Sequence, residues 1–253
     1  MASITPARLL MALAALGLGV VTLVWSDFAL QWQLVPKTLG FKTELAWASG
    51  AFLLLVGAGL PARRTARVAA VSLGVYWLGW SLLKLPVALT HIDNVGAWLG
   101  FCESFTIAIG GWALFSARGQ GSTSGGASLT VARLLLGACL VEFGLSHFVY
   151  LKITAGLMPG WMPLKTPLAM LAGAGHIAAG LGLIANLAPR LAATAEAMMM
   201  LAITLLVPAA GLVADPASRA QWTALFVSLP LAGAVWAMAE WIGGPLLAVR
   251  SRP

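Results

Sequence analysis

Three titratable side chains stand inside apolar stretches in the second half of the chain. Glu142 and His147 lie in one apolar run, and His176 lies in the next. Titratable groups are costly in a lipid bilayer, so they usually face the interior of a helical bundle and mark functional sites. A histidine can hydrogen-bond a quinone carbonyl and exchange a proton near neutral pH. We therefore predict a polar pocket for a quinone head group or a proton, lined by Glu142, His147 and His176.

The spacing of these residues limits the shape of the pocket. Glu142 and His147 are five residues apart, which is about 140° around a helix, so they can line two sides of a cleft but cannot share one face. His176 is expected near the middle of the membrane. The alternative is structural: His147 is then an interface residue beside Tyr150, and His176 is a hydrogen-bond partner in the core.

Other polar residues have simpler interpretations. Lys84 and Glu103 lie in the outer parts of two consecutive antiparallel spans, which predicts a structural ion pair. Two intramembrane histidines also raise the possibility of bis-histidine ligation of haem b, but their different depths argue against it. Three histidines without a Cys/His cluster provide too few ligands for a metal site, and none is predicted.

The composition excludes a soluble globular domain. Of the 253 residues, 60% are apolar and 9% are charged, whereas soluble domains have about 25% charged residues. Disordered chains are poor in apolar residues, so disorder is excluded as well. The net charge of +7 comes from basic residues that separate apolar runs and do not cluster with aromatic ones. Membrane lipid is therefore the expected partner, and nucleic acid is not.

The apolar runs predict an all-α polytopic membrane protein. A membrane-spanning helix needs about 20 mostly apolar residues, and eight runs reach this length: 8–26, 44–62, 67–89, 95–116, 131–151, 166–187, 191–213 and 221–248. Every arginine except Arg219 then falls on one side of the membrane. The positive-inside rule places that side, and both termini, in the cytoplasm, as expected for a multi-pass protein of the inner (cytoplasmic) membrane.

A Gly/Ser-rich stretch divides the chain near its midpoint. It reads GQGSTSGGAS at 119–128, which is typical of a flexible linker. We predict a first four-helix transmembrane repeat at 1–118, a cytoplasmic linker at 119–129 and a second four-helix repeat at 130–253. The eight spans would thus form two repeated four-helix bundles.

The two halves align with each other. Arg8 aligns with Arg133 at a distance of 125 residues, and 46–60 aligns with 169–183 at a distance of 123. Four spans in each half predict a parallel repeat, because both halves then enter the membrane in the same direction. The second half alone carries the three polar groups, whose counterparts in the first half are Gly17, Thr22 and Leu53.

The segment 133–212 resembles the DoxX-like membrane family. The resemblance rests on ARLLLGACLVEFGLSHF at 132–148, on the loop LMPGWMP and on LAGAGHIAAGLGLIANLAPRLAA at 171–193. His147 falls on a position that family members fill with His or Lys, and His176 on one usually held by Glu. The chain thus looks like a double-length member. The resemblance implies a four-helix unit and association with redox systems, since members resemble subunits of thiosulfate:quinone oxidoreductase and relatives assist maturation of amine dehydrogenase.

These observations leave three functions open. The first is a membrane subunit that links a partner oxidoreductase, in the membrane or the periplasm, to the quinone pool; the chain is then at most one subunit of an enzyme, and quinone is its possible cofactor. The second is a non-catalytic structural or assembly subunit of a larger membrane complex. The third is a small-molecule transporter, although transporters usually have inverted repeats or broken helices around a midplane site.

Overall fold

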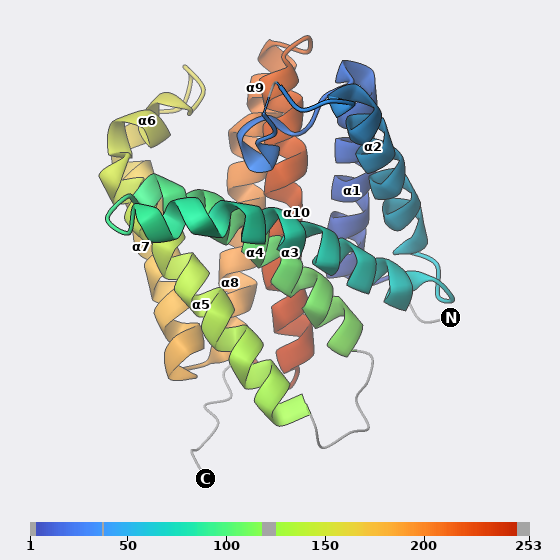
Figure 1. Cartoon of the computed structure of the whole chain (residues 1–253). Coiled ribbons are helices and arrows are strands. Elements are labelled where there is room, and N and C mark those ends of the chain that lie inside the picture. The colour runs from blue at the N-terminus through green and yellow to red at the C-terminus, as the bar shows by residue number, and fades with distance from the viewer. Residues whose placement is uncertain (1–3, 37, 118–124, 247–253) are drawn as a thin grey trace.

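A computed structural model describes residues 4–36, 38–117 and 125–246 of the chain (Figure 1). These residues fold into helices, and no strand is found among them. The elements are α1 (Pro6–Trp25), the 3-10 helix η1 (Leu30–Gln33), α2 (Lys42–Gly59), α3 (Ala66–Thr90), α4 (Val95–Ser116), α5 (Gly125–Val149), α6 (Leu151–Gly156), α7 (Lys165–Ala185), α8 (Pro189–Leu206), α9 (Pro208–Ala214) and α10 (Arg219–Ile242). The prediction of an all-helical polytopic membrane protein is confirmed.

The helices follow the predicted spans closely, although their number differs by one. Seven stretches of the described residues are long and apolar enough to cross a membrane, with α8 and α9 counted as one continuous stretch. The predicted span at 44–62, now α2, is not among them, because Lys42 and Glu44 occupy its first turn. Most of the predicted linker at 119–129 lies outside the described residues, and 125–129 already belong to α5.

Glycines bring α5 and α7 into backbone contact. A Cβ atom added to Gly144 would lie 2.5 Å from the carbonyl oxygen of Gly173, and one added to Gly137 would lie 2.8 Å from that of Gly180. From one pair to the next, the residue number falls by seven on α5 and rises by seven on α7. The two helices therefore run antiparallel in one fixed register. Hydrophobic burial does not hold helices together in lipid, so close approach over small residues is how such pairs associate.

The same crossing occurs between α1 and α2. A Cβ on Gly19 would lie 2.9 Å from the carbonyl oxygen of Gly50, and one on Gly57 would lie 3.1 Å from that of Ala12. These four residues are the counterparts of the α5–α7 contact residues in the alignment of the two halves. The pairing within each half is therefore alike.

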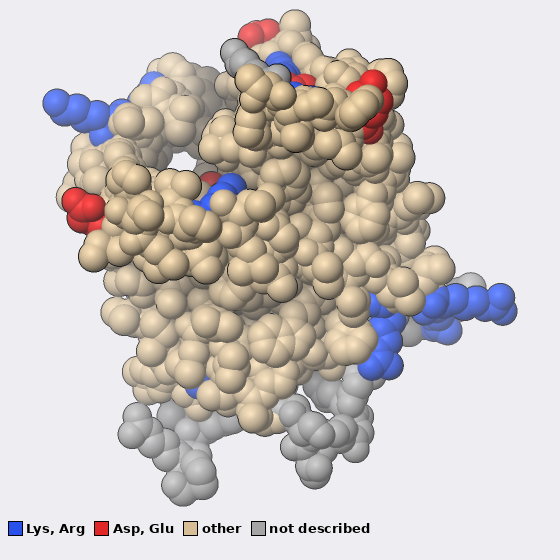
Figure 2. Space-filling view, viewed as in Figure 1, with Lys and Arg blue, Asp and Glu red and all other residues tan. Residues whose placement is uncertain are grey.

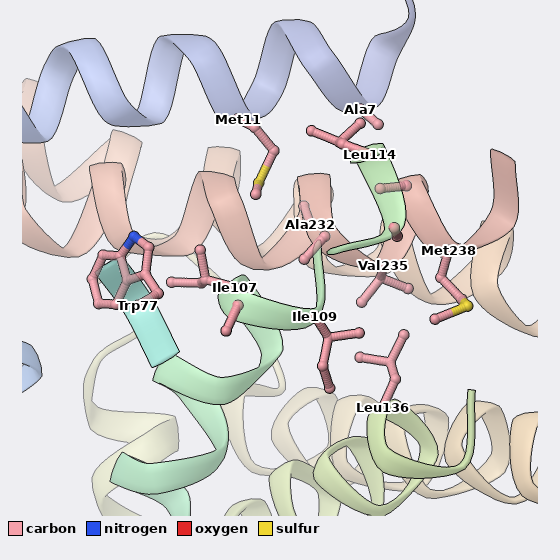
Figure 3. Close-up of a cluster of buried hydrophobic side chains, with 14 of the residues drawn as sticks. Ala7, Met11, Trp77, Ile107, Ile109, Leu114, Leu136, Ala232, Val235 and Met238 are labelled. Atoms are coloured by element: carbon pink, nitrogen blue, oxygen red, sulfur yellow. The ribbon is translucent and has the colours of Figure 1, made fainter. Parts of the chain in front are cut away.

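The two halves are joined through a shared core, so neither closes off as a separate bundle. The helix α10 packs against α8 of its own half and against α1 and α4 of the other, and α4 packs against α5. Figure 3 shows apolar side chains from α1, α3, α4, α5 and α10 meeting in this core. Trp77, Met11, Leu136 and Met238 are among its largest fully buried members.

Polar contacts mark the two ends of the bundle. At one end, the backbone N–H of Ala7 donates to Glu240 at 3.2 Å, and Arg133 donates to the carbonyl oxygen of Ile184 at 3.3 Å. At the other end, the backbone N–H of Gly96 donates to the hydroxyl of Tyr150. On the face that Figure 2 shows, most of the surface is uncharged, and the charged side chains lie in a few separate places.

The loop after α1 folds back over the first half. The side chain of Gln33 is buried and donates to the hydroxyl of Tyr76 at 2.5 Å, and that hydroxyl shares a second hydrogen bond with Ser49 at 2.6 Å. These bonds fasten η1 to α2 and α3. The corresponding segment of the second half, which follows α5 and contains α6, is not fastened in this way, because none of the residues of α6 is buried.

Asp27 fastens the same loop to two helices. Its carboxylate lies 2.7 Å from Lys42 of α2 and 3.3 Å from Arg219 of α10. Burial alone would raise the pKa of Asp27, but hydrogen bonds from Lys42 and the backbone of Phe28, together with the charges of Lys42 and Arg219, outweigh burial and lower it. The ionised carboxylate therefore stabilises the folded loop.

Adding one methyl group at the α5–α7 crossing should destabilise the protein. We expect Gly144→Ala to cost about 1–3 kcal/mol through overpacking, which corresponds to a fall of roughly 2–10 °C in the Tm of a chain of this size. Thermal unfolding in detergent measures the effect. The matched control is Gly126→Ala on the same helix, where a Cβ would meet no neighbouring atom; an equal loss in both variants would contradict the assignment.

Asp27→Asn should lower the Tm at neutral pH and flatten its dependence on acid. Because the folded-state pKa of Asp27 lies below its ordinary value of 3.8, its stabilisation is present above that value and is lost as the pH falls through the lowered pKa. Wild type should therefore lose more Tm than the variant when the pH is lowered through this range. Parallel curves for the two proteins would show that the Asp27 contacts add nothing.

Candidate functional site

His176 and Glu196 form a pair in the interior of the second half. Nδ1 of His176, on α7, lies 2.5 Å from Oε1 of Glu196, on α8. The side chain of His176 is 5% exposed and that of Glu196 is fully buried. The second carboxylate oxygen of Glu196 is buried without a hydrogen-bond partner. A buried charge needs a partner, and each of these groups supplies one for the other.

His147 of α5 extends this pair toward the membrane surface. Its ring centre lies 4.9 Å from that of His176, with the rings tilted by 54°. Its Nδ1 lies 2.8 Å from the carbonyl oxygen of Phe143, and the ring of Phe143 meets that of His176 edge-on. Because His147 is only half-buried, the three groups run from an accessible position to a buried one. We call His147, His176 and Glu196 the His–His–Glu cluster.

Small residues on α7 bring the three helices together. A Cβ on Gly173 would lie 2.9 Å from the Cβ of His147, so the absence of a side chain there lets His147 lie against α7. One on Gly175 would lie 2.6 Å from the sulfur of Met199 on α8. Both contacts lie within one turn of His176, so the cluster forms where the helices approach most closely.

Glu142, the third residue predicted for the pocket, has no hydrogen bond or ion pair to the cluster among the described contacts. One oxygen of its half-buried carboxyl group is buried without a partner, and the group interacts electrostatically with Cys102 of α4. The angle of about 140° between Glu142 and His147 accounts for this separation. The structure thus brings together His147 and His176 and places Glu142 toward α4.

Lys84 and Glu103, predicted as a structural ion pair, lie near each other on α3 and α4. The amine of Lys84 donates to the carbonyl oxygen of Gly100 and to the hydroxyl of Ser104, both at 2.8 Å. The ion pairs found among the described residues do not include Lys84 with Glu103, although the two groups interact electrostatically. Lys84 therefore fastens α3 to α4 through neutral acceptors.

Glu196 is the member of the cluster that we did not predict from the sequence. Its position about two turns from the start of α8 suggests a side chain able to reach water, whereas the structure buries it. The internal repeat contains a signal for it. The residues 123 positions before His176 and Glu196 are Leu53 and Leu73, which are fully buried and line one apolar hollow with Leu18 and Trp77. Two buried leucines that line the same hollow in one half thus occupy the positions of the His–Glu pair in the other.

The geometry limits which cofactors the site can hold. Metal–imidazole bonds of about 2.0–2.1 Å would put two ring centres roughly 6 Å apart across an iron, further than the 4.9 Å between His147 and His176. A haem does not fit between these rings as they stand. Among the described residues, no group of three His, Cys, Asp or Glu could hold a metal ion. The cluster consists of imidazole and carboxylate groups, the types of side chain that act as proton donors and acceptors, and its half-exposed end presents a ring that can form hydrogen bonds.

Comparison with known proteins places the cluster inside one domain. Residues 128–209 match the sequence model of the DoxX family, and this range holds α6, α7, α8 and nearly all of α5, including every residue of the His–His–Glu cluster. No curated protein and no solved structure matches the chain. The resemblance seen in the sequence is thereby confirmed for this segment: residues 128–209 of this multi-helix membrane protein carry a DoxX-like domain.

Proposed function

We propose that the chain is the membrane subunit of a redox system, in which the His–His–Glu cluster exchanges protons with a quinone. The observation that carries this proposal is the buried His176–Glu196 pair, 2.5 Å apart and connected through His147 to a half-exposed position. Quinone reduction and oxidation move protons together with electrons, so a quinone site in lipid needs titratable groups of this kind. The redox association of DoxX-like proteins agrees with this role.

The first half supplies an internal comparison that argues for function. At the positions of His176 and Glu196 it carries Leu53 and Leu73, both fully buried, and its helices α1 and α2 cross as α5 and α7 do. Packing at this place is therefore satisfied by two leucines. A buried His–Glu pair has a desolvation cost that leucines avoid, and replacing such pairs by apolar residues is often neutral or stabilising. The pair is thus better explained by chemistry than by stability.

The partners and the orientation belong to the same proposal. In this proposal the chain receives electrons from another membrane or periplasmic subunit. We place it in the inner membrane with both termini in the cytoplasm, which requires α2 to cross the membrane in addition to the seven apolar stretches. Arg190 supports this orientation, because it donates to the carbonyl oxygen of Gly244 at the same end as Arg133 and the start of α1, which collects basic residues on one side.

The double substitution His176→Leu with Glu196→Leu tests the proposed role. It copies the first half, so the variant should keep the Tm of wild type; a single substitution would leave an unpaired group and cost about 3–5 kcal/mol. Infrared difference spectra of the protein in nanodiscs, recorded while a decyl-substituted benzoquinone is reduced electrochemically, should show histidine and carboxyl bands in wild type. The carboxyl band should be absent from the double variant, and the histidine bands should be reduced to the contribution of His147.

The matched control is Leu53→Met with Leu73→Met, which alters the counterpart positions and should leave the spectrum unchanged. The proposal would be refuted if the wild-type difference spectrum contained no protein bands, or if the folded double variant gave the same spectrum as wild type. Persistence together with unchanged co-purification of partner subunits would favour the second candidate, a non-catalytic assembly subunit. That candidate draws support from α6, whose neighbourhood exposes large apolar side chains such as Leu157 and Trp161.

A further inference from the structure

The hydrogen bond of His147 determines which of its nitrogens can meet a ligand. Nδ1 lies 2.8 Å from the carbonyl oxygen of Phe143. A carbonyl oxygen only accepts, so Nδ1 must carry the hydrogen. In the neutral ring Nε2 then carries a lone pair and is an acceptor. The tautomer of His147 is thus set by the backbone of its own helix.

This acceptor nitrogen is open. Nε2 of His147 has no hydrogen-bond partner among the described contacts, and it is not one of the buried polar atoms without a partner. On the facing helix, Gly173 carries no side chain beside the Cβ of His147. The neighbouring ring of Phe148 is 39% exposed and offers an apolar surface beside it. A lipid-soluble ring can therefore reach Nε2 from the membrane side.

The buried pair behind His147 fixes the ring against which it lies. Glu196 lies at the buried end of the cluster, with one oxygen on His176 and the other unpartnered. A buried carboxylate hydrogen-bonded to an imidazole orients that ring, as in Ser-His-Asp triads. Because the oriented ring of His176 lies 4.9 Å from that of His147, it limits how His147 can turn and keeps the acceptor Nε2 available to a ligand that brings a hydrogen.

We infer that the cluster recognises the reduced, hydroxyl-bearing form of its ligand: a hydroquinone or related lipid-soluble phenol whose O–H donates to Nε2 of His147. The oxidised quinone has only carbonyl oxygens, which accept hydrogen bonds. It therefore cannot form a hydrogen bond with Nε2 of a neutral His147, which is also an acceptor. This inference rests on the proposed function and adds to it the form of the ligand that is bound. His147 is the residue that discriminates between the two forms.

Nitrogen-15 NMR of the histidine rings tests the inference directly. The chain has three histidines, so His91→Gln leaves only the two rings of the cluster in labelled protein in nanodiscs. Three probes of equal chain length are compared: a 4-alkylphenol, the matching 4-alkylanisole and the matching alkylbenzoquinone. The phenol should shift the Nε2 resonance of His147 and bind about tenfold more tightly than the other two.

His147→Leu should remove the preference for the phenol, while the protein stays folded and the resonances of the His176 ring remain observable. If the benzoquinone binds as tightly as the phenol through His147, or if the spectrum shows the hydrogen on Nε2, the inference is overturned while the proposed function stands. If none of the three probes binds in a His147-dependent way, both fail. Equal binding of phenol and anisole would also overturn the inference.

Discussion

The antiparallel contact between the backbones of α5 and α7 is the interaction on which the candidate site depends. Gly144 and Gly173 bring the two helices so close that no side chain fits between them, and His147 and His176 lie beside that contact. In lipid, this closeness has to come from packing of small residues, because burial from water contributes nothing between spans. Wider spacing would separate the rings and leave His147 without contact to the buried pair.

The repetition of this contact in the first half separates what the fold requires from what the site adds. Gly19 and Gly50 cross as Gly144 and Gly173 do, yet the first half places leucines where the second has His176 and Glu196. Its own polar residues lie elsewhere, in the network of Gln33, Tyr76 and Ser49 that fastens η1. One arrangement of helices thus supports an apolar interior in one half and a titratable one in the other.

The sequence was sufficient to predict most of the fold, because transmembrane helices must satisfy their own backbone hydrogen bonds and must be apolar over a known length. The span at 95–116 coincides with α4. The sequence was insufficient for α2, because charged residues at one end of that helix lower its mean hydropathy. It was also insufficient to predict how the two halves are joined, because hydropathy carries no information on which helices α10 contacts.

For the site, the sequence indicated which residue types to follow but not how they pair. His147 and His176 were predicted together because both are titratable groups in lipid. Glu196 was missed because its distance from a helix end suggested access to water, and only the packing of α8 on α7 buries it. Glu142 was grouped with the histidines although its position around α5 directs it to α4. The depth of a residue in the membrane follows from its position along one helix. Its contact partners also depend on how that helix and its neighbour are rotated about their axes.

The central position of α10 connects the two halves energetically as well as geometrically. It contacts α8, which carries Glu196, and also α1 and α4 of the other half, and its side chains Val235 and Met238 are fully buried between them. A closely packed interior transmits displacement, because it has few voids to absorb it. A change in the volume or charge at Glu196 therefore acts on a helix that the first half also contacts.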